Sequence, residues 1–236
     1  GYYDHYSFWL AEMKNKNSFT DLQSDWQKSY GAYVQNPVLQ DPLVFFKNPL
    51  ERGHIFLNSE TFNAWLHDPF EETFEESEYS NNLLRNRMLN EIRHETIPVI
   101  LHEDDRNSMY YSVENRSPYL DRDLAEFLFQ IPPEFLIKNG YVKYLLRATG
   151  TGFVSDNVLW DKRKRGFNAP IDHLVDRKDK VTREHLMADG PIFDIVRKDK
   201  IESYLNSDLT DNSFSKNLFS FISAKLFLEH YQDWNP

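Results

Sequence analysis

The run of ionisable residues at 104–121 is the part of the sequence with the clearest potential for chemistry, because its charged side chains lie close to apolar residues that should be buried. Buried charges persist only when they are paired and hydrogen-bonded. Arg106 beside Asp105 would meet that requirement, and so would Arg116 two positions after Glu114. The run therefore predicts either a functional site or a joint between helices that is held by ion pairs.

A second stretch, residues 138–165, is basic within an acidic chain. The 236 residues include 27 basic and 37 acidic side chains, for a formal charge of −10, yet this stretch has seven basic residues against two acidic ones. Local positive charge in an acidic protein suggests a site for an anion. A basic surface that binds nothing is the alternative. The seven residues are Lys138, Lys143, Arg147, Lys162, Arg163, Lys164 and Arg165.

Several well-known catalytic and metal-binding motifs are incomplete here. The chain has no cysteine, which excludes thiolate metal sites and a cysteine nucleophile. His94-Glu95 begins like the zinc motif HExxH, but Pro98 stands where the second histidine belongs. A zinc site would need scattered histidines or carboxylates, so no metal ligands are predicted. None of the eight glycines adjoins another, and Gly150-Thr151-Gly152 lacks the third glycine of a dinucleotide loop.

Composition and hydropathy restrict the class of protein. With 40% hydrophobic and 15% aromatic residues, the chain has the composition of a globular protein with a substantial core. Its net negative charge argues against nucleic acid as a partner. No stretch approaches the roughly 18 apolar residues of a membrane span, and the N-terminus lacks the features of a signal peptide. We therefore expect no membrane partner and a cytoplasmic location.

Apolar residues recur mostly with helical spacing, and no convincing run of alternating β-branched residues is found. This pattern predicts an all-α fold with one core, a single helical domain over residues 1–236, and loops at 36–59 and 68–78. Residues 120–131 form the clearest amphipathic helix, with Asp121 or Pro118 at its start and Pro132 at its end. The other predicted helices are 5–14, 18–35, 79–98 with an end or kink at Pro98, 142–148, 170–187, 199–205 and 214–232.

Three motifs together resemble the glutamine-dependent asparagine synthetases. Residues 105–121 resemble the family pattern D-R-x-S-M-x-x-S-x-E-x-R-x-P-[FY]-L-D, and residues 143–147 resemble its K-x-x-L-R. Residues 160–170 resemble R-x-K-x-G-F-x-x-P, and Gly1-Tyr2 looks like the end of S-G-x-G-x-D-E-x-F-x-G-Y. The order of the motifs makes the combination far more specific than any one of them.

The resemblance implies a reaction and roles for particular residues. Members of this family use ATP and Mg²⁺ to convert aspartate into a β-aspartyl-adenylate and pyrophosphate, and ammonia from glutamine then attacks the adenylate. By motif match Lys143 contacts the phosphates as a catalytic and ATP-binding group, because a fixed ammonium stabilises charge that develops on them. Lys164 and Arg165 are further candidates for phosphate binding. Glu103 lies where some amide-forming relatives carry a proton-accepting carboxylate, although many asparagine synthetases have lysine there.

Two departures from the family pattern concern its catalytic signatures. The glutaminase nucleophile is a cysteine and the nucleotide loop reads S-G-G-x-D-S, and this chain contains neither. We therefore expect the C-terminal, helical portion of an α/β synthetase domain whose parallel sheet lies largely elsewhere, inactive and without tight ATP binding by itself. Its expected partners are aspartate or a related carboxylate, an upstream nucleotide loop and a glutaminase domain.

Two alternatives to asparagine synthesis remain at this point. One is a related adenylate-forming amidoligase, such as a β-lactam synthetase, a macrolactam cyclase or a sugar amidotransferase. The other is a non-catalytic helical interaction module. The motifs do not decide which acceptor is used.

Overall fold

The computed structural model describes residues 3–34, 36–54, 59–70, 75–163, 171–208 and 212–231. Within these ranges the regular elements are helices apart from one hairpin and isolated bridges, which confirms the all-α prediction. It divides into two compact units, residues 1–54 with 74–164 and residues 55–73 with 165–236. Each unit has its own apolar core, whereas the sequence pattern led us to expect one core. No helix in the described part is long and apolar enough to cross a membrane.

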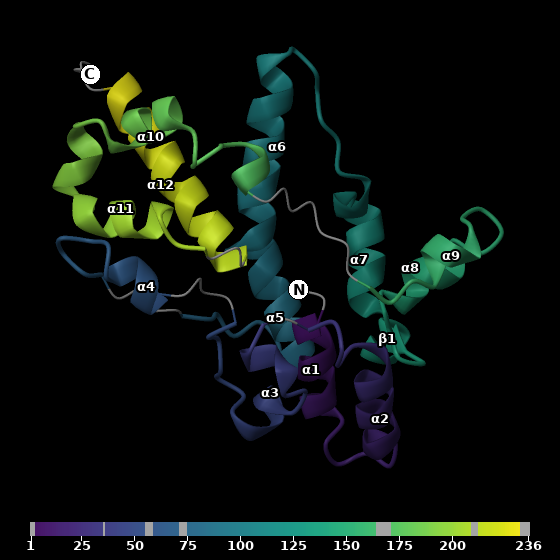
Figure 1. Ribbon diagram of the computed structural model, residues 1–236. Helices are drawn as coiled ribbons and strands as arrows, with labels where there is room; N and C mark the ends of the chain where they lie inside the picture. The colour runs from purple at the N-terminus through teal and green to yellow at the C-terminus, as the bar shows by residue number, and fades with distance from the viewer. Residues whose placement is uncertain are drawn as a thin grey trace. The chain divides into compact units, whose positions relative to one another are not determined.

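Helix α1 (Tyr3–Glu12) is at the centre of the first unit. It packs against α2 (Phe19–Ser29), α3 (Val44–Lys47) and α5 (Leu83–Arg93) (Figure 1). Its residues Phe8 and Leu10 are fully buried, and Phe8 stacks on Phe45 of α3 with ring centroids 3.8 Å apart. The short 3-10 helix η1 (Val38–Gln40) and α3 both lie within the segment 36–59, which was expected to be loop.

The helix predicted to continue to Pro98 is two helices in the structure. Helix α5 ends at Arg93, and α6 (Thr96–Tyr110) begins two residues before the proline. Pro98 is thus in the first turn of α6. A backbone N–H at this position would have no acceptor within the helix, so the proline costs no intrahelical hydrogen bond.

Several short elements follow α6 in the first unit. They are the 3-10 helix η2 (Pro118–Leu120), α7 (Arg122–Gln130), the 3-10 helix η3 (Pro133–Phe135), strands β1 (Ile137–Lys138) and β2 (Tyr141–Val142), α8 (Tyr144–Thr149) and α9 (Asp156–Leu159). Asp121 caps α7 by accepting a hydrogen bond from the Leu124 amide, as the sequence predicted. The apolar face of α7 is nevertheless uncovered by the described residues, since none of its side chains is buried and Phe127 is 59% exposed.

The second unit is built around α12 (Asn212–His230). Its other elements are α4 (Ser59–Asn63), the 3-10 helices η4 (Ile171–His173) and η5 (Pro191–Asp194), α10 (Lys180–Met187) and α11 (Lys198–Leu205). Trp65 packs edge-on against Tyr204 of α11 at 4.2 Å, and Phe214 of α12 stacks on the same tyrosine. The helix predicted over 170–187 is therefore replaced, in its described part, by η4 and α10 with a turn between them.

Arg87 of α5 is a charged side chain inside the first unit, and only 2% of the residue is exposed. It donates hydrogen bonds to Glu76 at 2.9 Å and to Glu95 at 2.7 Å, and its Nε lies 4.0 Å from a Glu91 oxygen. Burial alone lowers the pKa of Arg87, but its hydrogen bonds to Glu95 and Glu76 outweigh that effect and raise it. These ion pairs join α5 to the segment before it and to the start of α6.

We predict that Arg87→Met lowers the free energy of unfolding of the first unit by about 3–5 kcal/mol, because it leaves buried carboxylates without their partner. The control is Arg122→Met. Arg122 pairs with Glu126 across one helical turn, but its side chain is 86% exposed, so about 0.5 kcal/mol or less is expected. Urea unfolding followed by circular dichroism measures both changes. Equal losses in the two variants would contradict the assigned role of the Arg87 ion pairs.

Candidate functional site

A tight β-hairpin places Lys143. Strands β1 and β2 pair antiparallel, with Ile137 opposite Val142, and the two residues of the connecting turn are Asn139 and Gly140. Both turn residues have positive φ, 54° and 72°. This is the type I′ geometry that Asn-Gly favours, because it matches the twist of the paired strands. Lys143 comes directly after the second strand.

The backbone of Lys143 is in the left-handed conformation, with φ 56° and ψ 34°. This conformation costs a non-glycine residue about 1–2 kcal/mol. It allows the chain to pass from β2 directly into α8, and the Tyr144 amide then bonds the Leu136 carbonyl at 2.9 Å. The strained backbone is thus held by hydrogen bonds on both sides of the lysine, one in the hairpin and one at the start of α8.

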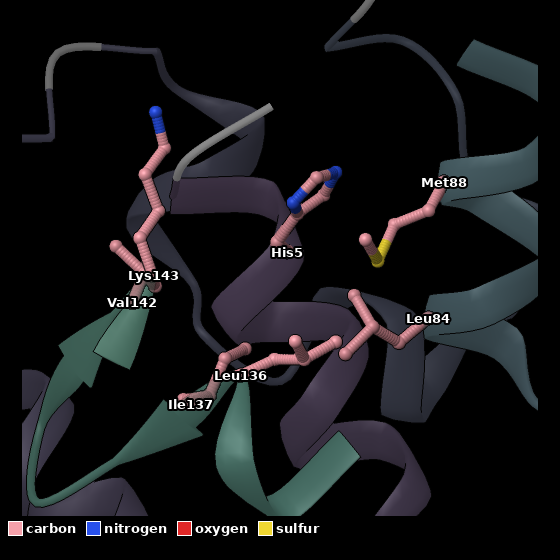
Figure 2. A pocket seen from close by; sticks show the side chains of 7 residues that line it. All are labelled: His5, Leu84, Met88, Leu136, Ile137, Val142 and Lys143. Atoms are coloured by element: carbon pink, nitrogen blue, oxygen red, sulfur yellow. The ribbon is translucent and has the colours of Figure 1, made fainter. Parts of the chain in front are cut away.

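Lys143 lines a cavity of about 100 Å³ in the first unit (Figure 2). The other lining residues are His5, Leu84, Met88, Leu136, Ile137 and Val142. Figure 2 shows the lysine side chain extending away from the apolar floor, with its ammonium beyond the aliphatic side chains. His5 lies between Lys143 and Met88 in the same view. The cavity therefore combines an apolar floor with two nitrogen-bearing side chains.

The orientation of His5 is fixed by Glu91 of α5. The His5 Nε2 lies 2.9 Å from a Glu91 carboxylate oxygen, and both side chains are largely buried. Burial raises the pKa of Glu91, but the hydrogen bond and the charge of His5 outweigh it and lower the pKa to about 2. Glu91 is therefore ionised at neutral pH and accepts the Nε2 proton. The Nδ1 side of the ring faces the Lys143 side of the cavity (Figure 2).

Most of the basic stretch has structural roles. Arg147 donates to the carbonyl oxygens of Val142 at 2.9 Å and Asp161 at 3.0 Å, and also to that of Leu159. It therefore connects the hairpin to the segment after α9. A guanidinium has the several donors that such bridging needs.

Lys162 and Arg163 also have partners within the first unit. Lys162 donates to the Ser29 hydroxyl at 2.7 Å and lies 4.3 Å from the centre of the Tyr141 ring. Burial lowers the pKa of Lys162, and this effect together with the nearby Arg147 outweighs the opposing charge of Asp25. Arg163 pairs with Asp161 at 2.9 Å. Within the described stretch, Lys143 is the basic residue that lines the cavity, and exposed Lys138 is nearby in sequence.

The remaining predicted residues have mixed outcomes. Glu103 is exposed on α6 and is not among the residues that line the cavity with Lys143. Lys164 and Arg165 lie outside the described residues. The predicted pair between Arg116 and Glu114 forms, but its side chains are 80% and 70% exposed, so it contributes little stability. The charged run is therefore a solvent-facing segment within the described structure rather than a buried ionic joint.

His5 is the cavity residue that sequence reasoning missed. It belongs to no motif, and it reaches the cavity only because α1 packs against α5. Its position on a helix with several fully buried neighbours was the one available signal, since a polar ring on such a helix needs a partner.

We predict that Lys143→Gly is more stable than Lys143→Ala by about 1 kcal/mol, because glycine adopts the left-handed conformation without a steric penalty. Urea unfolding of the two variants measures the difference. Both variants lack the ammonium, so the comparison isolates the backbone. An alanine variant as stable as the glycine variant would show that Lys143 is not strained.

A second prediction concerns Arg147→Lys, which keeps the positive charge and loses the fork of donors. We expect a loss of about 2 kcal/mol, because buried carbonyl groups lose their hydrogen bonds. Arg163→Lys is the matched control, since Arg163 is exposed and pairs only with its neighbour Asp161 in the described contacts; its cost is expected to stay below about 0.5 kcal/mol. Similar midpoints of urea unfolding for the two variants would argue against the bridging role of Arg147.

Comparison with known proteins adds independent evidence. Residues 6–229 match the family model described as asparagine synthase. A 117-residue stretch is 32% identical to "Asparagine synthetase [glutamine-hydrolyzing] 1" of Bacillus subtilis (strain 168). That stretch is 48% of this chain and 18% of the relative, so the chain corresponds to a small part of the longer protein. No solved structure gives a significant match.

The family match covers nearly the whole chain, including the hairpin, Lys143 and both compact units. The resemblance first noted in three short motifs is thereby extended to the segments between and beyond them. The chain belongs to the asparagine synthase family.

Proposed function

We propose that this chain supplies the phosphate-contacting lysine, Lys143, to an ATP-dependent ligase that makes asparagine from aspartate. In the proposed reaction the aspartate β-carboxylate attacks the α-phosphorus of ATP, and pyrophosphate leaves. Ammonia derived from glutamine then displaces AMP from the acyl carbon. We place this activity in the cytoplasm. The observation that carries the proposal is the position of Lys143 among the residues that line the cavity, within the motif K-x-x-L-R.

The described residues fit one phosphate group better than a whole nucleotide. The cavity of about 100 Å³ is smaller than the roughly 300–1,000 Å³ of most ligand pockets. Its lining is mainly aliphatic, and the 236 residues contain no Gly-Gly loop that could cradle phosphates. The adenosine moiety, Mg²⁺ and glutamine hydrolysis are therefore assigned to other parts of a longer enzyme. Lys143 would contribute a fixed positive charge where negative charge develops on the phosphates.

A strained backbone at Lys143 supports a functional role for its side chain. Conformations of this kind cluster at functional sites because the surrounding structure must hold them. The hairpin, the bond from Tyr144 to Leu136 and the Arg147 bridge all act on this short segment. Glu103 as the proton acceptor stays a prediction from the motif.

The test uses the enzyme that carries this chain together with the S-G-G-x-D-S loop. We predict that Lys143→Ala lowers aspartate-dependent ATP–pyrophosphate exchange by about 100-fold or more, the typical effect of losing one transition-state contact. Glutamine hydrolysis should be unchanged. The matched control is Lys138→Ala, an exposed lysine on the first strand of the same hairpin, which should keep exchange within about twofold.

The outcomes separate the proposed function from its alternatives. Full exchange in Lys143→Ala would refute the assignment of the lysine. Exchange that requires another carboxylic acid instead of aspartate would identify a related amidoligase. The 236-residue chain alone should show no exchange, and activity from it would overturn the assignment of the nucleotide loop to other residues.

A further inference from the structure

The two ring nitrogens of His5 have different surroundings. Nε2 lies 2.9 Å from a Glu91 carboxylate oxygen, and the two side chains are 19% and 12% exposed. Nδ1 faces the Lys143 side of the cavity (Figure 2) and has no hydrogen-bond partner among the described residues. Because the ionised Glu91 accepts the Nε2 proton, the neutral ring carries its lone pair on Nδ1. The lining of the cavity therefore includes a nitrogen that accepts protons.

A carboxylate behind an imidazole favours transfer of a proton to the other ring nitrogen. The carboxylate holds the tautomer and the orientation of the ring, and it stabilises the imidazolium that forms. Asp4 adds a second negative charge, since one oxygen or nitrogen atom from each of Asp4, His5 and Glu91 lies within 4.8 Å of the other two. Both carboxylates also have other neighbours, with Arg87 Nε 4.0 Å from Glu91 and His54 Nε2 3.6 Å from Asp4. Their charge is thus shared between His5 and these groups.

The proposed reaction contains a step that needs a proton acceptor. When ammonia adds to the acyl carbon of the β-aspartyl-adenylate, its nitrogen becomes positively charged and must lose a proton to give the amide. A base that removes this proton as the C–N bond forms lowers the barrier. A single oxygen atom separates the acyl carbon from the α-phosphorus. A base that shares a cavity with the phosphate-contacting Lys143 is therefore on the reacting side of the adenylate.

The cavity suits this step better than the surface around Glu103 does. Its volume of about 100 Å³ exceeds the roughly 10–15 Å³ that a water-sized molecule such as ammonia needs. Its aliphatic lining, with Leu84 and Ile137 among the residues, limits the access of water that would hydrolyse an adenylate. Glu103, the candidate from the motif, is exposed on α6 and does not line this cavity.

We propose that His5 is the proton acceptor of the amide-forming step, with Glu91 as its positioning residue. This inference rests on the proposed function. The lone pair of ammonia forms the C–N bond while the carbonyl electrons move onto oxygen, and His5 Nδ1 takes one proton from the nitrogen. The carbonyl then re-forms as the C–O bond to AMP breaks. The imidazolium returns its proton to solvent after AMP has left.

The experiment measures the two half-reactions separately, in the enzyme that carries this chain together with the S-G-G-x-D-S loop. Ammonia replaces glutamine, so the glutaminase step is bypassed. His5→Ala should lower asparagine formation about 100-fold or more, the usual contribution of a positioned base. Aspartate-dependent ATP–pyrophosphate exchange should stay within about threefold, because adenylation transfers no proton to His5. Added imidazole should restore asparagine formation at least about tenfold by occupying the space that the ring leaves.

Two further variants separate catalysis from structure. Glu91→Gln keeps the size of the side chain and removes its charge, so asparagine formation should fall at least about tenfold while exchange continues. His102→Ala removes an exposed histidine of α6. It should leave both half-reactions within about twofold and gain nothing from imidazole. Circular dichroism and retained exchange establish that each variant is folded, and Glu91→Gln decides the question if His5→Ala does not fold.

The outcomes distinguish this proposal from the proposed function. Normal asparagine formation in His5→Ala with normal exchange would overturn the assignment of His5 alone. An equal fall in both half-reactions, or a loss that imidazole does not restore, would also overturn it, because His5 would then act only through the fold. Absence of exchange in the wild-type enzyme would overturn both proposals, and full exchange in Lys143→Ala would refute only the role of the lysine.

Discussion

Arg87 has the lowest exposure among the charged side chains described in the first unit, and its ion pairs constrain where the surrounding segments can lie. Glu76 comes from the extended segment before α5, and Glu95 from the joint between α5 and α6. Removing one member of such a set leaves an unpaired charge in the poorly polarizable interior. The free-energy cost of that unpaired charge is larger than the net stability that the intact pair contributes. The position of α5 is therefore set by charge as well as by its apolar face.

The same helix determines the geometry of the cavity. Glu91 lies one turn after Arg87 and fixes His5 of α1, while Leu84 and Met88 form part of the apolar lining. The opposite wall is the hairpin, whose left-handed exit places Lys143. The strained backbone at Lys143 is consistent with the idea that local stability is given up where a side chain must be held in one position. Buried ion pairs on α5 thus help to position His5, and the tight turn of the hairpin positions Lys143.

Sequence patterns predicted where the helices lie better than they predicted which helices contact one another. Asp121 and Pro132 correctly bracketed α7 because capping and helix-breaking are local properties. The hairpin was missed although Asn139-Gly140 is a strong turn signal, because strands of two residues are too short to show alternation. The sequence predicted an amphipathic helix here, yet no described residue buries the apolar face of α7. Amphipathicity indicates that a face favours a partner, but it does not say which segment provides one.

The site residues also differ in whether the sequence could predict them. Lys143 was singled out because a local motif contains it, whereas His5 reaches the cavity only through the packing of α1 against α5. Arg147 belongs to the same motif as Lys143, but its three carbonyl partners show a structural role that residue type alone did not reveal. Motif membership therefore does not by itself distinguish a residue that contacts substrate from one that supports it.

The central claim is that α5 and the hairpin hold His5 and Lys143 at one cavity. A crystal structure of the chain tests this most directly. The account predicts a left-handed backbone at Lys143 and a His5 ring that is hydrogen-bonded to Glu91 while it lines the cavity. An extended backbone at Lys143, or a His5 ring turned away from Glu91 and the cavity, would contradict it.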